Sequence, residues 1–208
     1  MTFRLSASLL AFSLIIPVAS AEETIIGKVV EKTYTVKGDT PYDLYVSIGQ
    51  NGPRGAIANT NYSLTWKRLF DEEGGDCRLV SAKPIFTTTY LLPKVSGKLK
   101  PPLDRLWQDF IAGVRKHEQQ HGQMLQEMVK NTQQRIADAR VTNDRICAKV
   151  KRVVSDIIEQ ERQTYRSRSR DFDRAELAEG GNLHQLILTF VNGDRPPPQP
   201  ATTGTPFP

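Results

Sequence analysis

Residues 103–139 read LDRLWQDFIAGVRKHEQQHGQMLQEMVKNTQQRIADA, and they carry the most strongly helical pattern in the chain. Apolar and histidine side chains recur there at steps of three and four residues, so they form one stripe along a helix. The members of this stripe are Leu103, Leu106, Trp107, Phe110, Val114, His117, His121, Leu125 and Met128. We therefore expect one long helix, from near Leu103 to about Ala139, whose stripe packs against the rest of the protein.

The stripe contains the pattern H-E-x-x-H at residues 117–121. Two histidines four residues apart lie on the same helix face, so both rings can reach one Zn²⁺ at about 2.0–2.1 Å. On a buried face a charged imidazolium is costly, whereas a neutral, metal-bound ring is not. The pattern therefore predicts that His117 and His121 bind zinc. Glu118 then takes a proton from the metal-bound water, as in zinc peptidases.

The two ends of the chain differ in composition from the middle. Arg4, an apolar run over Leu5–Ile16 and an A-x-A pattern at Ala19–Ala21 are typical of a secretory signal peptide. The alternative is an uncleaved anchor, although the apolar run is short for a membrane span. We expect cleavage after Ala21 and a periplasmic or secreted protein with no stable membrane insertion. A single α+β domain then covers residues 22–191, and the proline-rich tail over 192–208 is expected to be disordered.

Charge and cysteine content narrow the possibilities further. The net charge is +5, and charges of both signs alternate along the helical segments, which indicates a solvated surface and no nucleic-acid partner. Cys77 and Cys147 are the two cysteines. In an oxidising compartment an even pair predicts one disulfide, and the alternative is two separate buried thiols.

The remaining segments predict a sheet and further helices. Thr40-Pro41-Tyr42-Asp43 has the residues of a capped helix start. A second long helix is expected from about Arg145 to Arg174, forming an antiparallel hairpin with the first. Leu183–Val191 is an apolar segment that suits either a helix or a strand.

Segments rich in β-branched and aromatic residues predict about four strands, at 25–36, 61–66, 77–82 and 85–92. The fold class is therefore α+β, with a small antiparallel sheet packed against a long helical hairpin that carries H-E-x-x-H.

The order of these parts resembles a bacterial family of unknown function that has been described as predicted secreted zinc-dependent proteases. The resemblance runs from about Tyr34 to Gly181. Its carriers are Tyr34–Thr40, Tyr62–Trp66, Cys77, Pro93, Trp107–Phe110, His117–His121, Cys147 and Phe172-Asp173. The resemblance implies a secreted zinc peptidase built around the H-E-x-x-H helix.

The chain departs from that family's pattern after the second helix. The family's Tyr-Asp, here Phe172-Asp173, is usually followed by Thr-x-His-Gly, and the His-Gly appears here as Glu179-Gly180. If the family histidine is a third zinc ligand, Glu179 can replace it, because zinc accepts carboxylate oxygen. We therefore expect Glu179 to be the third ligand.

Three other residues compete with Glu179 for this role. Glu161 falls on the apolar stripe of the second helix, and it lies across from His121 if the hairpin turns near Val141. Asp173 and His184 are further candidates. Asp173 could instead accept a hydrogen bond from one of the ligand rings.

The leading functional hypothesis is a secreted or periplasmic zinc-dependent peptidase that acts on a peptide or protein in the cell envelope. The alternative is a non-catalytic envelope binding module that retains a metal site. A third hypothesis, a purely structural helical hairpin, predicts that replacing either histidine leaves the metal content unchanged. A nucleophilic hydrolase is poorly supported, because the chain has no G-x-S-x-G motif.

Overall fold

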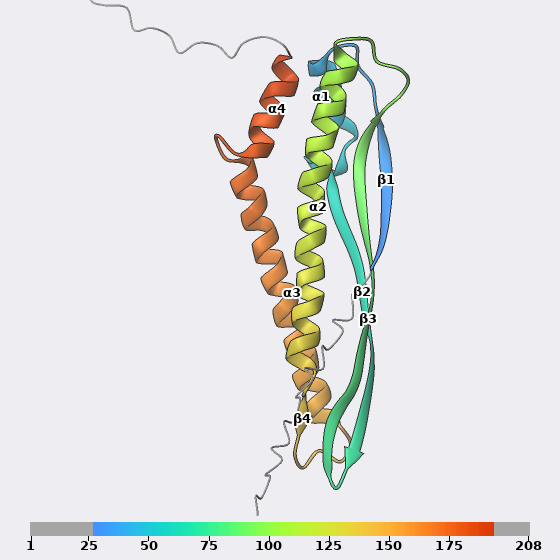
Figure 1. Cartoon of the computed structure of the whole chain (residues 1–208), viewed down its shortest axis with the longest axis vertical. Helices are drawn as coiled ribbons and strands as arrows, with labels where there is room; N and C mark the ends of the chain where they lie inside the picture. The colour runs from blue at the N-terminus through green and yellow to red at the C-terminus, as the bar shows by residue number, and fades with distance from the viewer. Residues whose placement is uncertain (1–26, 194–208) are drawn as a thin grey trace, which may run out of the picture.

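Helix α2 (Leu103–Ile136) lies between a sheet on one side and helices α3 (Ala148–Leu177) and α4 (Asn182–Asn192) on the other (Figure 1). The computed structural model describes residues 27–193. Helices α2 and α3 run antiparallel, and α2 also contacts strands β2 and β3 and helix α4. The predicted α+β class, with a small sheet against a long helical hairpin, is confirmed.

The sheet is mixed, which corrects the prediction of a purely antiparallel one. Its strands are β1 (Lys28–Val36), β2 (Asn59–Glu73), β3 (Asp76–Val95) and the short β4 (Arg140–Val141). Strands β2 and β3 form an antiparallel hairpin, and β4 pairs antiparallel with β3, but β1 pairs with β3 in parallel. The hairpin turns at two glycines with φ angles of 63° and 90°, a region that glycine adopts at no steric cost.

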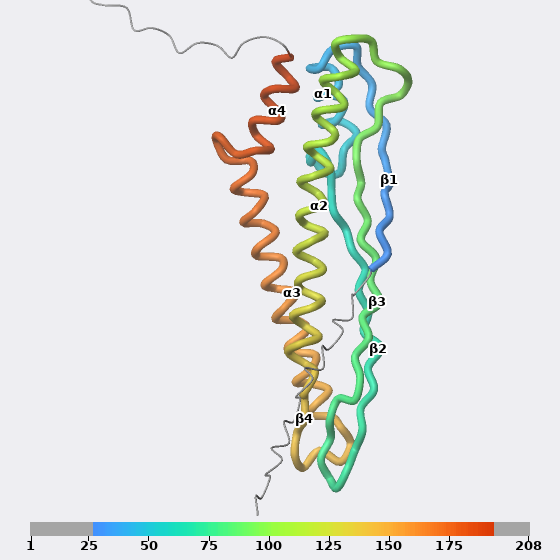
Figure 2. The backbone as a smooth tube through the Cα atoms, in the orientation of Figure 1, coloured from blue at the N-terminus to red at the C-terminus, as the bar shows by residue number. Residues whose placement is uncertain are grey.

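Strand β3 is a single strand of 20 residues where the sequence predicts two strands, at 77–82 and 85–92. Pro84 interrupts the sequence pattern, because proline cannot donate a hydrogen bond to a neighbouring strand. In the structure Pro84 pairs with Trp66 of β2. Strand β1 begins opposite Thr87, so β3 has no β1 neighbour at Pro84 (Figure 2). The proline is therefore tolerated inside a long strand.

The short helix α1 (Pro41–Asn51) begins as its sequence predicts. The backbone N–H of Asp43 donates a hydrogen bond of 3.1 Å to the Thr40 hydroxyl, and proline occupies the first helical position. A single 3₁₀ turn, η1 (Pro53–Gly55), follows and leads into β2. Leu183–Val191, for which both a helix and a strand were considered, lies within helix α4.

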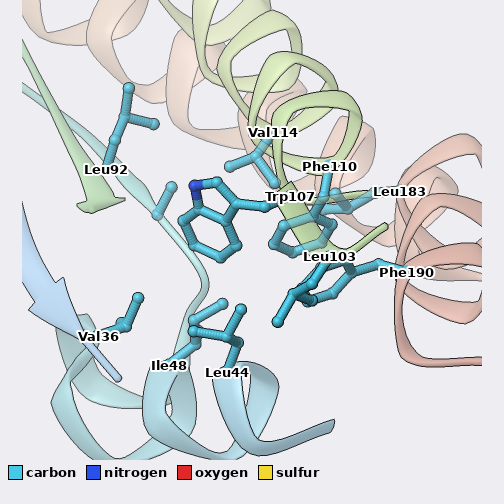
Figure 3. Packing of buried hydrophobic residues seen from close by; sticks show 11 residues of the cluster. Val36, Leu44, Ile48, Leu92, Leu103, Trp107, Phe110, Val114, Leu183 and Phe190 are labelled. Carbon is cyan, nitrogen blue, oxygen red and sulfur yellow. The ribbon is translucent and has the colours of Figure 1, made fainter. Parts of the chain in front are cut away.

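Two apolar clusters flank the H-E-x-x-H motif along α2, one on each side of it. The α4-end core stacks Phe110 of α2 on Phe190 of α4, with ring centroids 4.3 Å apart (Figure 3). Its members are Val36, Leu44, Ile48, Ala58, Leu92, Leu103, Trp107, Phe110, Val114, Leu183 and Phe190. The middle core consists of Leu64, Phe86, Leu125, Met128, Val129 and Tyr165. His117 and His121 therefore lie on α2 between Val114 of the first cluster and Leu125 of the second.

The predicted disulfide between Cys77 and Cys147 is confirmed. It joins β3 to the residue that precedes α3, beside the short pairing of β3 with β4. Helix α3 starts at Ala148, three residues after the predicted start near Arg145, so Ile146 precedes the helix and is 79% exposed.

The predicted signal peptide and cleavage site lie outside the described residues, as does the tail beyond residue 193, for which disorder is predicted. Within residues 27–193, no helix has the length and apolar character that a membrane span requires.

We predict that Gly122→Ala destabilises the protein, because Gly122 lets the sheet approach α2 closely. A Cβ atom at this position would lie 2.1 Å from Oη and 3.1 Å from Cζ of Tyr90 on β3. We expect a loss of about 1–3 kcal/mol in the free energy of unfolding, measured with urea, and partial restoration by Tyr90→Phe. Gly49→Ala is the control, since nothing lies within 4 Å of that exposed helical position. It should stabilise the protein by up to about 1 kcal/mol.

We also predict that the disulfide contributes about 4 kcal/mol to stability, because its cysteines are 70 residues apart in the chain. Urea unfolding of the wild-type protein with and without a reductant measures this contribution. The double variant Cys77→Ser/Cys147→Ser should have the stability of the reduced protein and should not respond to the reductant. Equal stability of the oxidised and reduced wild type would contradict the prediction.

Candidate metal centre and its cavity

His117 and His121 meet Asp173 at the interface of α2 and α3. The Nε2 atoms of the two rings are 3.2 Å apart. Oδ1 of Asp173 lies 3.2 Å from Nε2 of His117 and 2.8 Å from Nε2 of His121. Both histidines are buried, and Asp173 is partly exposed. One donor atom from each residue therefore points into a common space.

The spacing of these three atoms fits a tetrahedral zinc ion. Ligand atoms bound at about 2.0–2.1 Å in a tetrahedron lie about 3.3–3.4 Å from one another. Two imidazole nitrogens and one carboxylate oxygen are also a donor set that zinc accepts in sites with an open position. His117, His121 and Asp173 could therefore hold Zn²⁺ with little rearrangement.

Further side chains orient the two rings. Oγ of Ser169 lies 2.9 Å from Nδ1 of His121, so it can accept a hydrogen bond from that nitrogen when Nε2 faces the metal position. Phe172 stacks on the ring of His117 at 4.8 Å and meets His121 edge-on at 5.3 Å. Nδ1 of His117 is buried without a hydrogen-bond partner among the described residues, and Oε2 of Glu176 is 3.7 Å from it. These contacts turn both Nε2 atoms toward Asp173.

Glu118 is held by the sheet. The Thr60 hydroxyl, at the start of β2, lies 2.5 Å from Oε2 of Glu118 and 3.1 Å from its backbone carbonyl. The residue is only 5% exposed. Burial raises the pKa of its carboxyl group, and this effect outweighs the hydrogen bond from Thr60 and the nearby histidines, which act in the opposite direction.

His117 and Asp173 shift each other's pKa. Burial lowers the pKa of His117, but the hydrogen bond with Asp173 and the charges of Glu118, Asp173 and Glu176 outweigh it and raise the pKa. Burial raises the pKa of Asp173, but its hydrogen bonds with both rings hold that pKa well below its usual range. Asp173 is therefore an ionised carboxylate at neutral pH, as a metal ligand must be.

A cavity of about 350 Å³ opens onto this group. Its polar side is formed by the three donor residues together with Glu118, Thr60 and Ser169. The larger apolar side chains of its lining, which we call the apolar wall, are Tyr45, Ile57, Val114, Leu177, Leu183 and Ile187. Such a volume lies at the lower end of the range for small-molecule sites, about 300–1,000 Å³.

The structure brings together His117, Glu118 and His121 as predicted, but Glu179 is not beside them. Glu179 is exposed in the turn that follows α3, and Asp173 occupies the position expected for it. The reason is that α3 continues to Leu177. Asp173 therefore lies on the inner face of the helix, whereas Glu179 lies beyond its end.

Glu161 and His184 are also absent from this group of donor atoms. Glu161 pairs with Arg135 of α2 at 2.7 Å, about 20 Å farther along α2 than His121. Nδ1 of His184 accepts a hydrogen bond of 3.3 Å from the backbone N–H of Gly180. Glu161 lies opposite Arg135, and Asp173 lies opposite His121. The antiparallel helix pair is therefore centred near residue 147 and not near Val141.

Thr60 and Ser169 contribute to the site and were not predicted from the sequence. Thr60 precedes the predicted strand over 61–66, and nothing in its local pattern indicates a contact with α2. Ser169 could have been found, because it follows the inward-facing Tyr165 by four residues and precedes Asp173 by four. Extending the inner stripe of α3 by two further steps leads from Tyr165 to Ser169 and Asp173.

Comparisons with known proteins identify the family but not an activity. Residues 31–181 match the family model described as "Bacterial protein of unknown function (DUF922)". This match confirms the resemblance drawn from the order of the motifs, and it includes all the residues of the metal centre. No curated protein and no solved structure matches the chain. Because the matched region covers more than half of its length, the chain belongs to the DUF922 family of bacterial proteins of unknown function.

Proposed function

We propose that this protein is a zinc-dependent peptidase that hydrolyses peptide bonds in a peptide or protein of the cell envelope. The observation that carries the proposal is the convergence of His117, His121 and Asp173 on one point of a cavity that Glu118 also lines. We propose Asp173, in place of Glu179, as the third zinc ligand. The disulfide is consistent with an oxidising compartment, such as the periplasm or the cell exterior.

The zinc ion, when bound, would act as a Lewis acid that polarises the carbonyl group of the peptide bond and makes water more acidic. Glu118 is the residue that takes the proton from the attacking water, because its carboxyl group lines the cavity beside the donor atoms. Thr60 keeps this carboxyl group in place through its hydrogen bond to Oε2. Ser169 and Phe172 fix the histidine rings, so the site is preorganised before substrate arrives.

We predict that Glu118→Gln abolishes hydrolysis while zinc binding persists. The substitution keeps the shape of the side chain but removes its basicity, so peptide hydrolysis should fall by about 10²–10⁴-fold. The assay uses the zinc-loaded mature protein with casein and a mixture of synthetic peptides. Removing the metal with a chelator should stop hydrolysis, and adding zinc should restore it. Asp109→Asn, which changes an exposed carboxylate on the same helix in the same way, is the control and should remain active.

Hydrolysis that survives Glu118→Gln would contradict the proposed role of this residue. Stoichiometric zinc without hydrolysis of any substrate would instead favour the non-catalytic binding module.

We predict that Asp173→Asn weakens zinc binding by at least about tenfold, because it removes the negative charge from the third donor. Glu179→Gln should leave the affinity unchanged, since Glu179 is not part of the donor group. Competition with a fluorescent chelator measures both affinities without any assay of activity. The opposite ranking of the two variants would restore Glu179 as the third ligand.

A further inference from the structure

The apolar wall lies directly beside the candidate metal centre. Val114 precedes His117 by three residues on α2, so its side chain is one helical turn away on the same face. Leu183 and Ile187 lie one turn apart on α4 and line the same cavity. The cavity therefore continues from the donor atoms to apolar side chains that include those of helices α2 and α4.

This apolar surface lies along the border of the α4-end core. Val114 and Leu183 are buried members of that core, and Tyr45, Ile57 and Ile187 pack against it. Within this core the rings of Phe110 and Phe190 stack on each other. The wall is therefore supported from behind by well-packed side chains, so it keeps its shape when a ligand contacts it.

The charges around the cavity favour an uncharged group on this wall. The carboxyl groups that line the cavity belong to Glu118 and Asp173, and no lysine or arginine of residues 27–193 lines it. An acidic side chain would find no cation there other than the metal itself. A basic side chain would lose its hydration on the apolar wall, and the two carboxyl groups of the cavity are already engaged, Glu118 by Thr60 and Asp173 by both histidines.

The size of the cavity limits the group that can enter. Its volume of about 350 Å³ must hold the peptide backbone at the donor atoms as well as a neighbouring side chain. This leaves room for one side chain of the size of leucine, methionine or phenylalanine. Burying such a side chain is favourable in proportion to the apolar area that it removes from water.

We propose that the apolar wall is a specificity pocket, and that it binds an apolar side chain of the substrate next to the bond to be cleaved. This inference rests on the proposed peptidase function and names its substrate class: peptides with a leucine-like or phenylalanine-like residue at that position. Leu183 and Ile187 of α4 are its specificity-determining residues.

The test measures binding and cleavage separately. Blocked hexapeptides share one Gly/Ala background and differ only at a central position, which is Leu, Phe, Asp or Lys. Their binding to the zinc-loaded Glu118→Gln protein is measured by calorimetry, and their cleavage by the wild type is measured as kcat/KM. We expect the Leu and Phe peptides to bind at least about tenfold more tightly than the Asp and Lys peptides and to be cleaved in the same order.

Ile187→Lys should reverse part of this preference, because it places a cation in the wall. We expect it to weaken binding of the Leu peptide and to strengthen binding of the Asp peptide, each by about tenfold. Leu188→Lys is the matched control, since Leu188 is 40% exposed on the same helix and does not line the cavity. The milder Ile187→Ala should reduce the preference for the Leu peptide if the lysine variant does not fold.

The two levels of the proposal fail in different ways. Equal binding and equal cleavage of all four peptides, or a preference that Ile187→Ala leaves unchanged, would overturn the pocket and leave the peptidase intact. Peptides that bind with the expected preference but are never cleaved would support the pocket and overturn the peptidase. The absence of peptide binding would overturn the pocket as well.

Discussion

The alignment of α2 with α3 determines whether this site exists. The chain places Asp173 opposite His121 and Glu161 opposite Arg135, so a shift of α3 by a single turn would separate the carboxylate from both rings. The alignment is fixed at both ends. The disulfide and strand β4 attach the start of α3 to β3, and helix α4, which follows α3 directly, packs its aromatic side chain into the α4-end core.

The position of the motif between two apolar clusters explains how a polar site persists in the interior. His117, Glu118 and His121 are all buried, and each has polar partners: Asp173 for both rings, Ser169 for His121 and Thr60 for Glu118. Buried polar groups are tolerated when they are paired in this way. The clusters on either side pack the sheet and the other helices against α2.

The helices and the local motif could be predicted from sequence because both depend on short-range spacing. The stripe along α2, the cap at Thr40 and the H-E-x-x-H pattern each depend on residues that are only a few positions apart in the chain. The third donor depends on how two helices pair. A turn near Val141 would bring Glu161 opposite His121. In the structure the connection after Ile136 runs on to Cys147, which the disulfide joins to Cys77, before α3 begins. The parallel pairing of β1 with β3 and the continuity of β3 through Pro84 also arise from contacts between distant segments.

The separation of the donors between two helices has a consequence for biogenesis. A nascent chain that has emerged only as far as α2 carries two imidazoles and no carboxylate partner for them, so it offers an ion a weak and exchangeable site. Because Asp173 lies on α3, all three donors can hold a metal ion only after α3 has packed against α2. Binding of a metal by this group would therefore be coupled to the completion of the fold.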